Sequence, residues 1–376
     1  MLKIISVVGA RPNFIKIAPF CRALKAYPNI RHILVHTGQH YDVRMSDSFF
    51  SDLDIQEPDI HLNIGSGSHA EQVGRTMIEF EKVVRSENPD WIVVVGDVNA
   101  TCACSVVAKK EHVRLAHIEA GLRSGDMDMP EEINRLVTDR LSDLLFTPDS
   151  FSNENLRAEG VPEDKIKFVG NIMIDTLESQ RAKVMMRSVS EIVNREILEP
   201  GTAIPELHEN GFAVMTMHRP SNVDDEGIMT KLISFLTEEV AKDMPLLWPI
   251  HPRAKKQLEL FGLWEKARQN IVLLNPLGYH DMLRLNMGAK IMLTDSGGLQ
   301  EECCVLGTPC LTLRWNTERP VTLYEHGGAS MLVGNDIVKI RAAYHEILKS
   351  ARSPQRPQLW DGHTADRIAD IIANAQ

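Results

Sequence analysis

Short apolar runs alternate with longer amphipathic segments over most of the chain, and this alternation predicts an α/β fold. The run Ile92-Val93-Val94-Val95 is continuously apolar and β-branched, which favours a strand covered on both faces and hence a parallel sheet. Helical crossovers between such strands build a doubly wound domain. In the first half we expect strands at 3–8, 31–36, 91–95, 114–118 and 144–147, joined by helices at 14–26, 71–85, 101–111 and 132–141.

The same alternation begins again after a break near the middle of the chain. Segment 176–197 has helical composition, and the breakers Glu199-Pro200-Gly201 and Pro205 follow it. We then expect strands at 211–217, 245–249, 289–293 and 309–313, with helices at 227–240 and 279–287. These patterns predict two Rossmann-like doubly wound domains that face a cleft, with ligands at the carboxyl ends of the strands. The expected parts are an N-terminal domain at 1–170, hinge and connecting helices at 171–204, a C-terminal domain at 205–358, and a helix at 359–376 that packs back on the first domain.

Composition narrows the class of protein. The chain has 376 residues, 43% of them hydrophobic, and a formal net charge of −10. This suits two globular domains and argues against nucleic acid or an anionic membrane as the main partner. The first residues are strand-like, so we expect no signal peptide, and no apolar run approaches membrane-spanning length. The six cysteines lack zinc-site spacing, and reduced, buried thiols in a cytoplasmic protein are the favoured interpretation.

Residues 294–302, Thr-Asp-Ser-Gly-Gly-Leu-Gln-Glu-Glu, form the most informative motif, because they follow an apolar run and open into a helical segment. Gly297 and Gly298 let the backbone approach a bulky ligand, and Ser296 adds a hydroxyl at the expected start of a helix. Free N–H groups and the helix dipole make such a start an anion site. Glu301 and Glu302 would repel a bare phosphate but can accept hydrogen bonds from the hydroxyl groups of a sugar or ribose. The motif therefore predicts a nucleotide-sugar pocket.

A second candidate site lies at the end of the first expected strand, in the run Gly9-Ala10-Arg11-Pro12. Arg11 offers a bidentate donor, and Lys16 would lie about one turn into the following helix. Both are expected to clamp a diphosphate. The alternative is that both are solvated surface charges, but their position at a strand-to-helix turn favours the clamp.

Acidic residues follow two later strands. Asp97 and Glu119 come at strand ends, Glu131 follows in the next loop, and Arg123 and Arg135 accompany them. Carboxylates gathered in one cleft raise some of their pKa values and serve proton transfer. Two alternatives remain, a helix cap for Asp97 and a magnesium site for the group. The basic clamp for the phosphates disfavours the metal, so we predict none.

The second domain places histidines at two strand ends. His218 is followed by Arg219, and His251 lies two residues before Arg253. A lone histidine is more often structural than functional, but two such groups at equivalent strand ends make function and structure equally favoured for each. Arg319 follows the strand after the glycine motif and is expected to reach the cleft.

A series of motifs, each weak alone, is highly specific in this order: Gly9-Ala10-Arg11-Pro12, His36-Thr37-Gly38-Gln39-His40, Gly96-Asp97, His117-Ile118-Glu119-Ala120-Gly121-Leu122-Arg123, Pro130-Glu131-Glu132-Ile133-Asn134-Arg135, Met217-His218-Arg219, 294–302 and Thr317-Glu318-Arg319-Pro320. With these motifs the chain resembles the non-hydrolysing UDP-N-acetylglucosamine 2-epimerases along essentially its whole length. The resemblance implies the glycosyltransferase-B architecture of two Rossmann-like domains, a homodimer, a UDP-sugar substrate, and neither a nicotinamide cofactor nor an obligatory metal.

The resemblance also implies a reaction and roles for residues. The reaction is interconversion of UDP-GlcNAc and UDP-ManNAc by anti elimination of UDP to 2-acetamidoglucal and re-addition, which supplies precursor for surface polysaccharide. The implied catalytic residues are Asp97, Glu119, Glu131 and His218. The implied UDP contacts are Arg11, Lys16, Ser296, Gly297, Gly298 and Glu302, to which we add Arg135, His251 and Arg319.

Other functions fit the same motifs. An epimerase of UDP-2,3-diacetamido-2,3-dideoxy-glucuronic acid shares nearly all of them, including the pattern Thr37-Gly38-Gln39-His40-Tyr41-Asp42. A hydrolysing epimerase would release ManNAc and UDP. A glycosyltransferase of the same architecture needs an acceptor site, of which the sequence shows no sign. A non-catalytic nucleotide-sugar sensor would not need the three carboxylates.

Overall fold

The computed structural model describes residues 1–38, 55, 57–199, 201 and 204–375. It divides into two compact units: unit 1 contains Met1–Ser179 and Pro357–Gln376, and unit 2 contains Gln180–Arg356. Residues 39–42, which carry part of the second motif, lie outside the described residues.

Unit 1 alternates strands and helices, as the sequence pattern predicts. Its elements are β1 (Leu2–Val8), α1 (Arg11–Leu24), β2 (Ile30–His36), β3 (Ile60–His61), α3 (His69–Glu87), β4 (Trp91–Val95), α4 (Asn99–Lys110), β5 (Arg114–Ile118), α5 (Pro130–Leu141), β6 (Leu144–Thr147), α6 (Ser150–Ala158), the 3-10 helix η1 (Glu163–Lys165), β7 (Ile166–Phe168), the first part of α7 (Ile172–Met185) and α17 (Thr364–Asn374).

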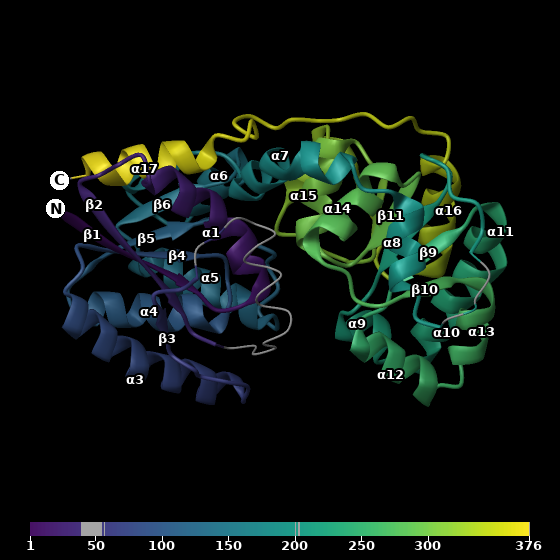
Figure 1. Cartoon of the computed structure of the whole chain (residues 1–376), viewed down its shortest axis with the longest axis horizontal. Helices are drawn as coiled ribbons and strands as arrows, with labels where there is room; N and C mark the ends of the chain where they lie inside the picture. Colours follow the sequence, from purple (N-terminus) through teal and green to yellow (C-terminus); the bar gives the residue numbers. More distant parts are fainter. Residues whose placement is uncertain (39–54, 56, 200, 202–203, 376) are drawn as a thin grey trace. The chain divides into compact units, whose positions relative to one another are not determined.

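The strands of unit 1 form one parallel sheet. Among the described residues seven strands lie in the order β3-β2-β1-β4-β5-β6-β7. Helices α3 and α4 lie side by side along one face, where Phe80 of α3 and Cys104 of α4 pack on Ile5 and Val7 of β1 (Figure 1). Every residue of β4 is buried, because its apolar run is covered on both faces. This arrangement is a doubly wound α/β domain.

Unit 2 repeats the alternation with shorter strands. Its elements are the remainder of α7, α8 (Val189–Glu196), β8 (Ala213–Thr216), α9 (Pro220–Val223), α10 (Glu226–Phe235), the π-helical turn η2 (Leu236–Val240), α11 (Ala241–Asp243), β9 (Leu246–Pro249), α12 (Pro252–Leu260), α13 (Trp264–Asn270), β10 (Val272–Leu274), α14 (Tyr279–Gly288), β11 (Ile291–Thr294), α15 (Gly297–Leu306), β12 (Cys310–Thr312), the 3-10 helices η3 (Pro320–Thr322) and η4 (Tyr324–His326), β13 (Ser330–Leu332) and α16 (Ile337–Ile347).

The sheet of unit 2 separates two apolar cores. Within the described part of the chain, six parallel strands lie in the order β10-β9-β8-β11-β12-β13. Met215 of β8 packs on one face with Tyr344 of α16. The preceding residue, Val214, packs on the opposite face of the sheet with Val193 of α8 and Cys303 of α15. Alternate residues thus feed two helical layers, as in a second Rossmann-like domain.

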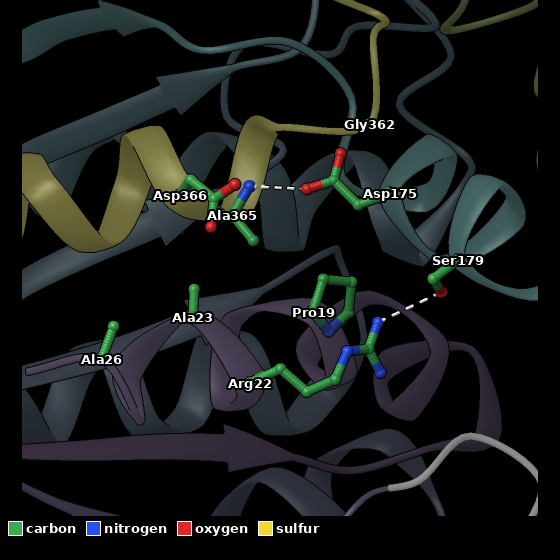
Figure 2. Close-up of a pocket in the computed structure, with 9 residues that line it drawn as sticks. All are labelled: Pro19, Arg22, Ala23, Ala26, Asp175, Ser179, Gly362, Ala365 and Asp366. Atoms are coloured by element: carbon green, nitrogen blue, oxygen red, sulfur yellow. Dashed lines mark hydrogen bonds between the residues drawn. The ribbon is translucent and has the colours of Figure 1, made fainter.

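The C-terminal segment belongs to unit 1, where α17 packs along α1 (Figure 1). Trp360 is buried, and its indole N–H donates to the carbonyl oxygen of Pro148 at 2.8 Å. The carboxylate of Asp175 in α7 accepts the backbone N–H of Thr364 at 3.1 Å. It also accepts that of Ala365 at 2.6 Å (Figure 2). These N–H groups have no partner within the first turn of α17. Asp175 therefore anchors the start of the helix.

The structure agrees with the sequence expectations best for long buried strands. The expected strands 91–95, 114–118 and 144–147 coincide with β4, β5 and β6. The sequence analysis did not predict α6, α12, α13, α16 or the short strands β3 and β13. A strand as short as β3 is defined by its pairing with β2 rather than by a local pattern, and α12 buries few residues.

Two expectations about side chains and membranes can be compared directly. The six cysteines are free thiols, all buried except the partly exposed Cys102, as expected for reduced cysteines. In the part of the chain that the structure describes, every helix is too short or too polar to traverse a lipid bilayer.

Candidate active site

Two candidate carboxylates of unit 1 lie at the ends of neighbouring strands. Asp97 follows β4 and Glu119 follows β5, and these strands pair in parallel. Glu119 is buried and has a φ of 71°, in the left-handed region that is costly for residues other than glycine. Its backbone N–H donates to the carbonyl oxygen of Phe146 on β6 at 3.1 Å. This contact to the next strand helps to hold the carboxylate at the sheet edge.

Lys16 contacts a carboxylate in unit 1. Its Nζ, on the second turn of α1, forms an ion pair with Glu119 Oε2, and the two side chains are only 9% and 3% exposed. Gly96 makes room for the pair, because a Cβ there would lie 3.1 Å from Lys16 Nζ. The second oxygen, Glu119 Oε1, is buried without a hydrogen-bond partner among the described residues. Lys16 therefore engages one carboxylate oxygen, and the other is left without a donor from the described residues.

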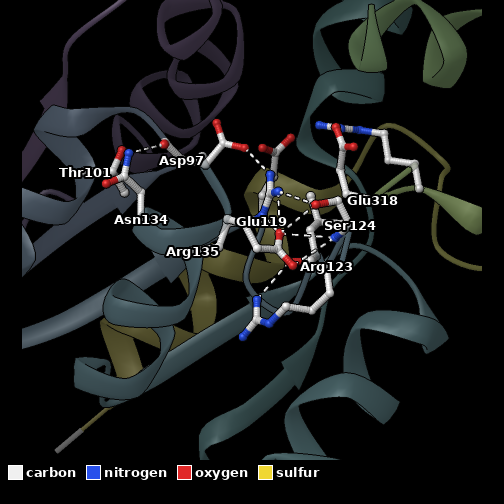
Figure 3. Close-up of polar contacts among 12 residues, drawn as sticks. Asp97, Thr101, Glu119, Arg123, Ser124, Asn134, Arg135 and Glu318 are labelled. Carbon is white, nitrogen blue, oxygen red and sulfur yellow. Dashed lines mark hydrogen bonds and ion pairs between the residues drawn. The ribbon is translucent and has the colours of Figure 1, made fainter. Parts of the chain in front are cut away.

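Asp97 has a separate cationic partner. Arg135 NH1 lies 2.5 Å from Asp97 Oδ2, and Asn134 Nδ2 donates to the backbone oxygen of Asp97 at 2.8 Å (Figure 3). Arg135 NH2 also lies 2.5 Å from Glu132 Oε2. Burial acts to raise the pKa of Glu132, but the backbone N–H of Ser124 and the Arg135 guanidinium hold it below its ordinary value. Glu132 thus fixes Arg135, which in turn orients the partly exposed Asp97.

His117 connects this edge to the interior of unit 1. Its Nε2 lies 2.9 Å from the carbonyl oxygen of Gly96, and its Nδ1 lies 2.6 Å from Asp139 Oδ1. Arg123 NH1 lies 2.7 Å from the other oxygen of Asp139. Burial acts to raise the pKa of Asp139, but the charges and hydrogen bonds of His117 and Arg123 bring it below its ordinary value. Both ring nitrogens face oxygen atoms, so His117 ties Gly96 to a buried charged cluster.

Two further candidates of unit 1 stand apart from these contacts. Glu131, in the first turn of α5, is exposed, whereas its neighbour Glu132 is buried against Arg135. Arg11 begins α1, but its side chain lies outside the described part of the chain. The structure therefore brings Lys16, Asp97, Glu119 and Arg135 to one edge of the sheet, while Glu131 lies on the surface.

The glycine motif of unit 2 forms the start of a helix, as the sequence predicts. Ser296 precedes α15, and its backbone N–H donates to Thr294 Oγ1 at 3.0 Å. Its hydroxyl makes no capping hydrogen bond within this fully described helix, so it does not satisfy the first N–H groups of α15. The helix dipole favours an anion there. A Cβ at Gly297 would lie 2.6 Å from Arg319 NH1, so glycine also lets this cation lie beside the helix start.

Arg319 belongs to a buried charge network. Its Nε lies 2.8 Å from Glu301 Oε1, and its NH1 pairs with Glu318 Oε1. Glu318 Oε2 is 2.7 Å from Arg314 NH2. All four side chains are at most 7% exposed. Two glutamates therefore balance two arginines and hold Arg319 in position next to α15.

A second carboxylate network organises the loop after β8. Asp295 is fully buried, and its Oδ2 accepts the backbone N–H of His218 at 3.0 Å, that of Arg219 at 2.8 Å and the side-chain amide of Asn222 at 3.1 Å. His218 Nδ1 lies 2.7 Å from Asp295 Oδ1, and the His218 side chain is 43% exposed. Burial acts to raise the pKa of Asp295, but His218 and the N–H donors bring it below its ordinary value. Asp295 is therefore an ionised, buried carboxylate in contact with the partly exposed imidazole of His218.

His251 lies beside His218, with ring centroids 5.7 Å apart. Its Nδ1 accepts the backbone N–H of Arg253 at 3.1 Å and so caps α12. Burial, followed by the nearby His218, lowers the pKa of His251. Because Nδ1 is used as an acceptor, the ring proton of neutral His251 lies on Nε2.

Glu302, the candidate for ribose hydroxyls, is buried in α15 near Tyr279 and Asn286. Burial raises the pKa of Glu302 to about 8, and Glu301 adds to this, while the nearby side chains of Asn286 and Tyr279 oppose it. A carboxyl group that stays protonated near neutral pH can both donate and accept hydrogen bonds. Within the described residues, no group of three or more His, Cys, Asp and Glu side chains is arranged to hold a metal ion.

Comparison with known proteins identifies the family. The sequence model described as UDP-N-acetylglucosamine 2-epimerase matches residues 22–373. The chain belongs to the UDP-N-acetylglucosamine 2-epimerase family. It is 40% identical over 375 residues to the UDP-N-acetylglucosamine 2-epimerase of Methanocaldococcus jannaschii, covering 99% of each chain. It is 37% identical over 381 residues to the UDP-2,3-diacetamido-2,3-dideoxy-D-glucuronate 2-epimerase of Pseudomonas aeruginosa, again covering 99% of each.

Solved structures confirm the predicted fold class. The crystal structure of the M. jannaschii UDP-GlcNAc 2-epimerase in complex with UDP-GlcNAc and UDP superposes with a TM-score of 0.88 at 39% identity, covering 99% of each chain. A glycotransferase of kitacinnamycin has a TM-score of 0.58 at 11% identity, a likeness of fold alone. The chain therefore has two Rossmann-like α/β domains of the glycosyltransferase-B type.

Sequence reasoning missed several residues that organise the site. Asp295 lies inside the glycine motif, so its position at a strand end was a usable signal, but nothing local showed that it would contact His218. Glu132 was not singled out because the adjacent Glu131 is also acidic and nothing local shows which of the two is buried. His117 lies inside a strand, and its bond to Asp139 depends on how α5 packs on β5.

Proposed function

We propose that this protein catalyses reversible epimerisation at C2 of UDP-N-acetylglucosamine to UDP-N-acetylmannosamine. The observation that carries the proposal is the pair of carboxylates at adjacent strand ends of unit 1, each with its own buried cation: Glu119 with Lys16 and Asp97 with Arg135. The relative from M. jannaschii, named for this activity and 40% identical over nearly the whole chain, supports the same substrate.

The chemistry requires groups that move a proton at a carbon of low acidity. In the elimination, a carboxylate takes the proton from C2, the C–H electrons form the C1–C2 double bond, and the C1–O electron pair leaves with UDP. Re-addition breaks that double bond, returns a proton to C2 from the opposite side and rebuilds the bond to UDP. We assign these proton transfers to Asp97, Glu119 and Glu131 without dividing the two steps among them. Buried Glu119, with one oxygen free of partners, suits proton transfer.

The remaining residues are proposed to hold UDP. Ser296, Gly297 and Gly298 at the start of α15 suit the diphosphate, and Glu302 suits the ribose hydroxyls. His218 is proposed to act at the phosphate end of the substrate. The other proposed UDP-sugar contacts are Arg11, Lys16, Arg135, His251 and Arg319.

Retention of the glycal intermediate makes the proposed reaction non-hydrolysing, because released glycal or water attack would yield free sugar. The proposal needs no nicotinamide and assigns no step to a metal. We further propose that the protein forms the homodimer that the family resemblance implies, acts in the cytoplasm and supplies precursor for surface polysaccharide.

A second candidate is epimerisation at C2 of UDP-2,3-diacetamido-2,3-dideoxy-glucuronic acid. The observation that favours it is the 37% identity, over 99% of both chains, to the P. aeruginosa enzyme named for that substrate. Both substrates share UDP and the C2 chemistry. They differ at C3 and C6.

One experiment separates these reactions. The purified protein is incubated with UDP-GlcNAc in deuterated water and followed by proton NMR. Epimerisation yields UDP-ManNAc with deuterium at C2 and an intact UDP-sugar. Free ManNAc with UDP would instead establish hydrolysis, and turnover of the diacetamido acid alone would establish the second candidate. Inertness towards both substrates would contradict the proposal.

Matched variants check the catalytic assignment. Glu119→Gln is expected to lower both turnover and C2 deuteration by a factor on the order of 100 or more. The control Glu163→Gln changes an exposed carboxylate of the same unit that pairs with Arg157, and it should retain the wild-type rate. Equal rates for both variants would contradict the role of Glu119.

A further inference from the structure

The carboxylate of Asp295 has two oxygen atoms with different tasks. Oδ2 accepts three N–H donors, the backbone amides of His218 and Arg219 and the side chain of Asn222. The backbone oxygen of Asp295 also accepts Arg219 Nε at 3.0 Å. These contacts fix the orientation of the carboxylate and leave Oδ1 facing His218 Nδ1 at 2.7 Å. The contact to the imidazole is therefore set by the fold and does not depend on a free rotation of Asp295.

An ionised carboxylate oxygen can only accept a hydrogen bond. A bare lone pair on His218 Nδ1, 2.7 Å from Asp295 Oδ1, would be repelled by the carboxylate charge, so the proton of neutral His218 is held at Nδ1. Nε2 is then the ring nitrogen left for a ligand. Among the described residues, Asp295 and the ring of His251 contact His218 from other elements, and Nδ1 of His251 is occupied as a helix cap. Arg219, next in sequence, is held against Asp295.

We propose that Asp295 is a positioning residue that keeps His218 protonated at Nδ1 and thereby presents Nε2 to the UDP-sugar. This inference rests on the proposed function for the role of His218, but the protonation pattern itself does not. With Nε2 presented, neutral His218 accepts a proton or hydrogen bond from the ligand, and protonated His218 donates one to a phosphate oxygen. The His218 ring can then serve both directions of a reversible reaction.

The substitution Asp295→Asn gives a sharp test, because the surrounding donors decide how the amide orients. The three N–H donors at Oδ2 require an oxygen there, so the amide nitrogen must take the place of Oδ1. That nitrogen donates to His218 Nδ1, which becomes an acceptor, and the ring proton moves to Nε2. A nearly isosteric change is therefore expected to invert the tautomer of one histidine.

The tautomer is read by NMR of protein labelled with 15N in histidine, at a pH where His218 is neutral. The signal of His218 is assigned from its loss in His218→Gln. Wild type is expected to show the proton on Nδ1 and Asp295→Asn to show it on Nε2. An Nε2–H tautomer in wild type would overturn the proposal without any variant, so the test survives if Asp295→Asn does not fold.

Kinetics and a control separate positioning from a structural role. Asp295→Asn is expected to lower kcat on the order of 100-fold while KM changes by less than about threefold, because the UDP contacts of α15 remain. The control Asn222→Ala removes one donor to Oδ2 and should lower thermal stability while it keeps the Nδ1–H tautomer. Wild-type kcat in a tautomer-inverted Asp295→Asn would overturn the positioning role. A wild-type protein inactive on both UDP-sugars would contradict the proposed function instead, and the tautomer measurement would still stand.

Discussion

Loss of either partner of the buried pair Lys16–Glu119 should destabilise unit 1 strongly. The side chains of Lys16 and Glu119 are only 9% and 3% exposed. Lys16→Met leaves the buried carboxylate of Glu119 without its cation, and Glu119→Gln leaves the buried ammonium of Lys16 without its anion. At an effective dielectric constant of about 20, two unit charges 4 Å apart attract by about 4 kcal/mol. Removal of one partner of a buried pair costs about 3–5 kcal/mol, because the remaining charge stays desolvated.

The double variant Lys16→Met with Glu119→Gln removes both charges at once. We expect it to be less destabilised than the sum of the single variants, with a coupling energy of about 2–3 kcal/mol. Because unfolding of a two-domain chain is not a single transition, the assay is hydrogen–deuterium exchange. Peptides from β1, β4 and β5 report the local free energy of opening, and peptides from β8 and β11 in unit 2 provide the internal reference.

The exposed pair Arg157–Glu163 of the same unit, with side chains 50% and 67% exposed, provides the matched control. Solvent screens such a pair, so its double-mutant cycle should give a much smaller coupling energy. A coupling at Lys16–Glu119 no larger than that of the control would refute the reasoning that burial makes this ion pair energetically strong.

Three further predictions follow from backbone geometry and burial. Gly96→Ala should destabilise unit 1 by about 1–2 kcal/mol for its φ of 67° alone, and by more because the added Cβ would lie 3.1 Å from Lys16 Nζ. The control Gly65→Ala has a similar φ of 73° and no atom within 4 Å of the added Cβ. Equal losses in the local free energy of opening, measured by hydrogen exchange, would contradict the steric part. Burial raises the pKa of Asp175 from 3.8 to about 6, so the stability that it contributes is complete below pH 3.8 and is lost as the pH rises through 6, a change of about 3 kcal/mol. Asp175→Asn should remove that pH dependence, measured by hydrogen exchange of α17 at pH 4.5 and 7.5, and an unchanged slope would speak against it. Burial also raises the pKa of Glu302 to about 8, so Glu302→Gln, which is neutral and of similar shape, should bind UDP at pH 7 with an affinity within about threefold of wild type. Glu302→Ala should lose about tenfold in affinity for UDP. Equal losses of affinity for the two variants, measured by calorimetry, would argue against a neutral carboxyl group.

The order of strands and helices was accessible from sequence because it depends on local composition. The run 91–95 is apolar at every position and rich in β-branched residues, which favours a strand buried on both faces. Turn-forming glycines and the start of α15 also follow from residue type. The sequence placed Asp97, Glu119 and Ser296 at strand ends for the same reason.

The partners of these residues were decided by tertiary structure. The ammonium of Lys16 contacts Glu119, which lies 103 positions away in the sequence, and no local pattern could predict that partner. Adjacent glutamates at 131 and 132 look equivalent in sequence, but successive helix positions point about 100° apart, and only Glu132 is buried against Arg135. A charge removed from water must find an opposite charge or donors close in space, and the packing of the elements determines which groups are close.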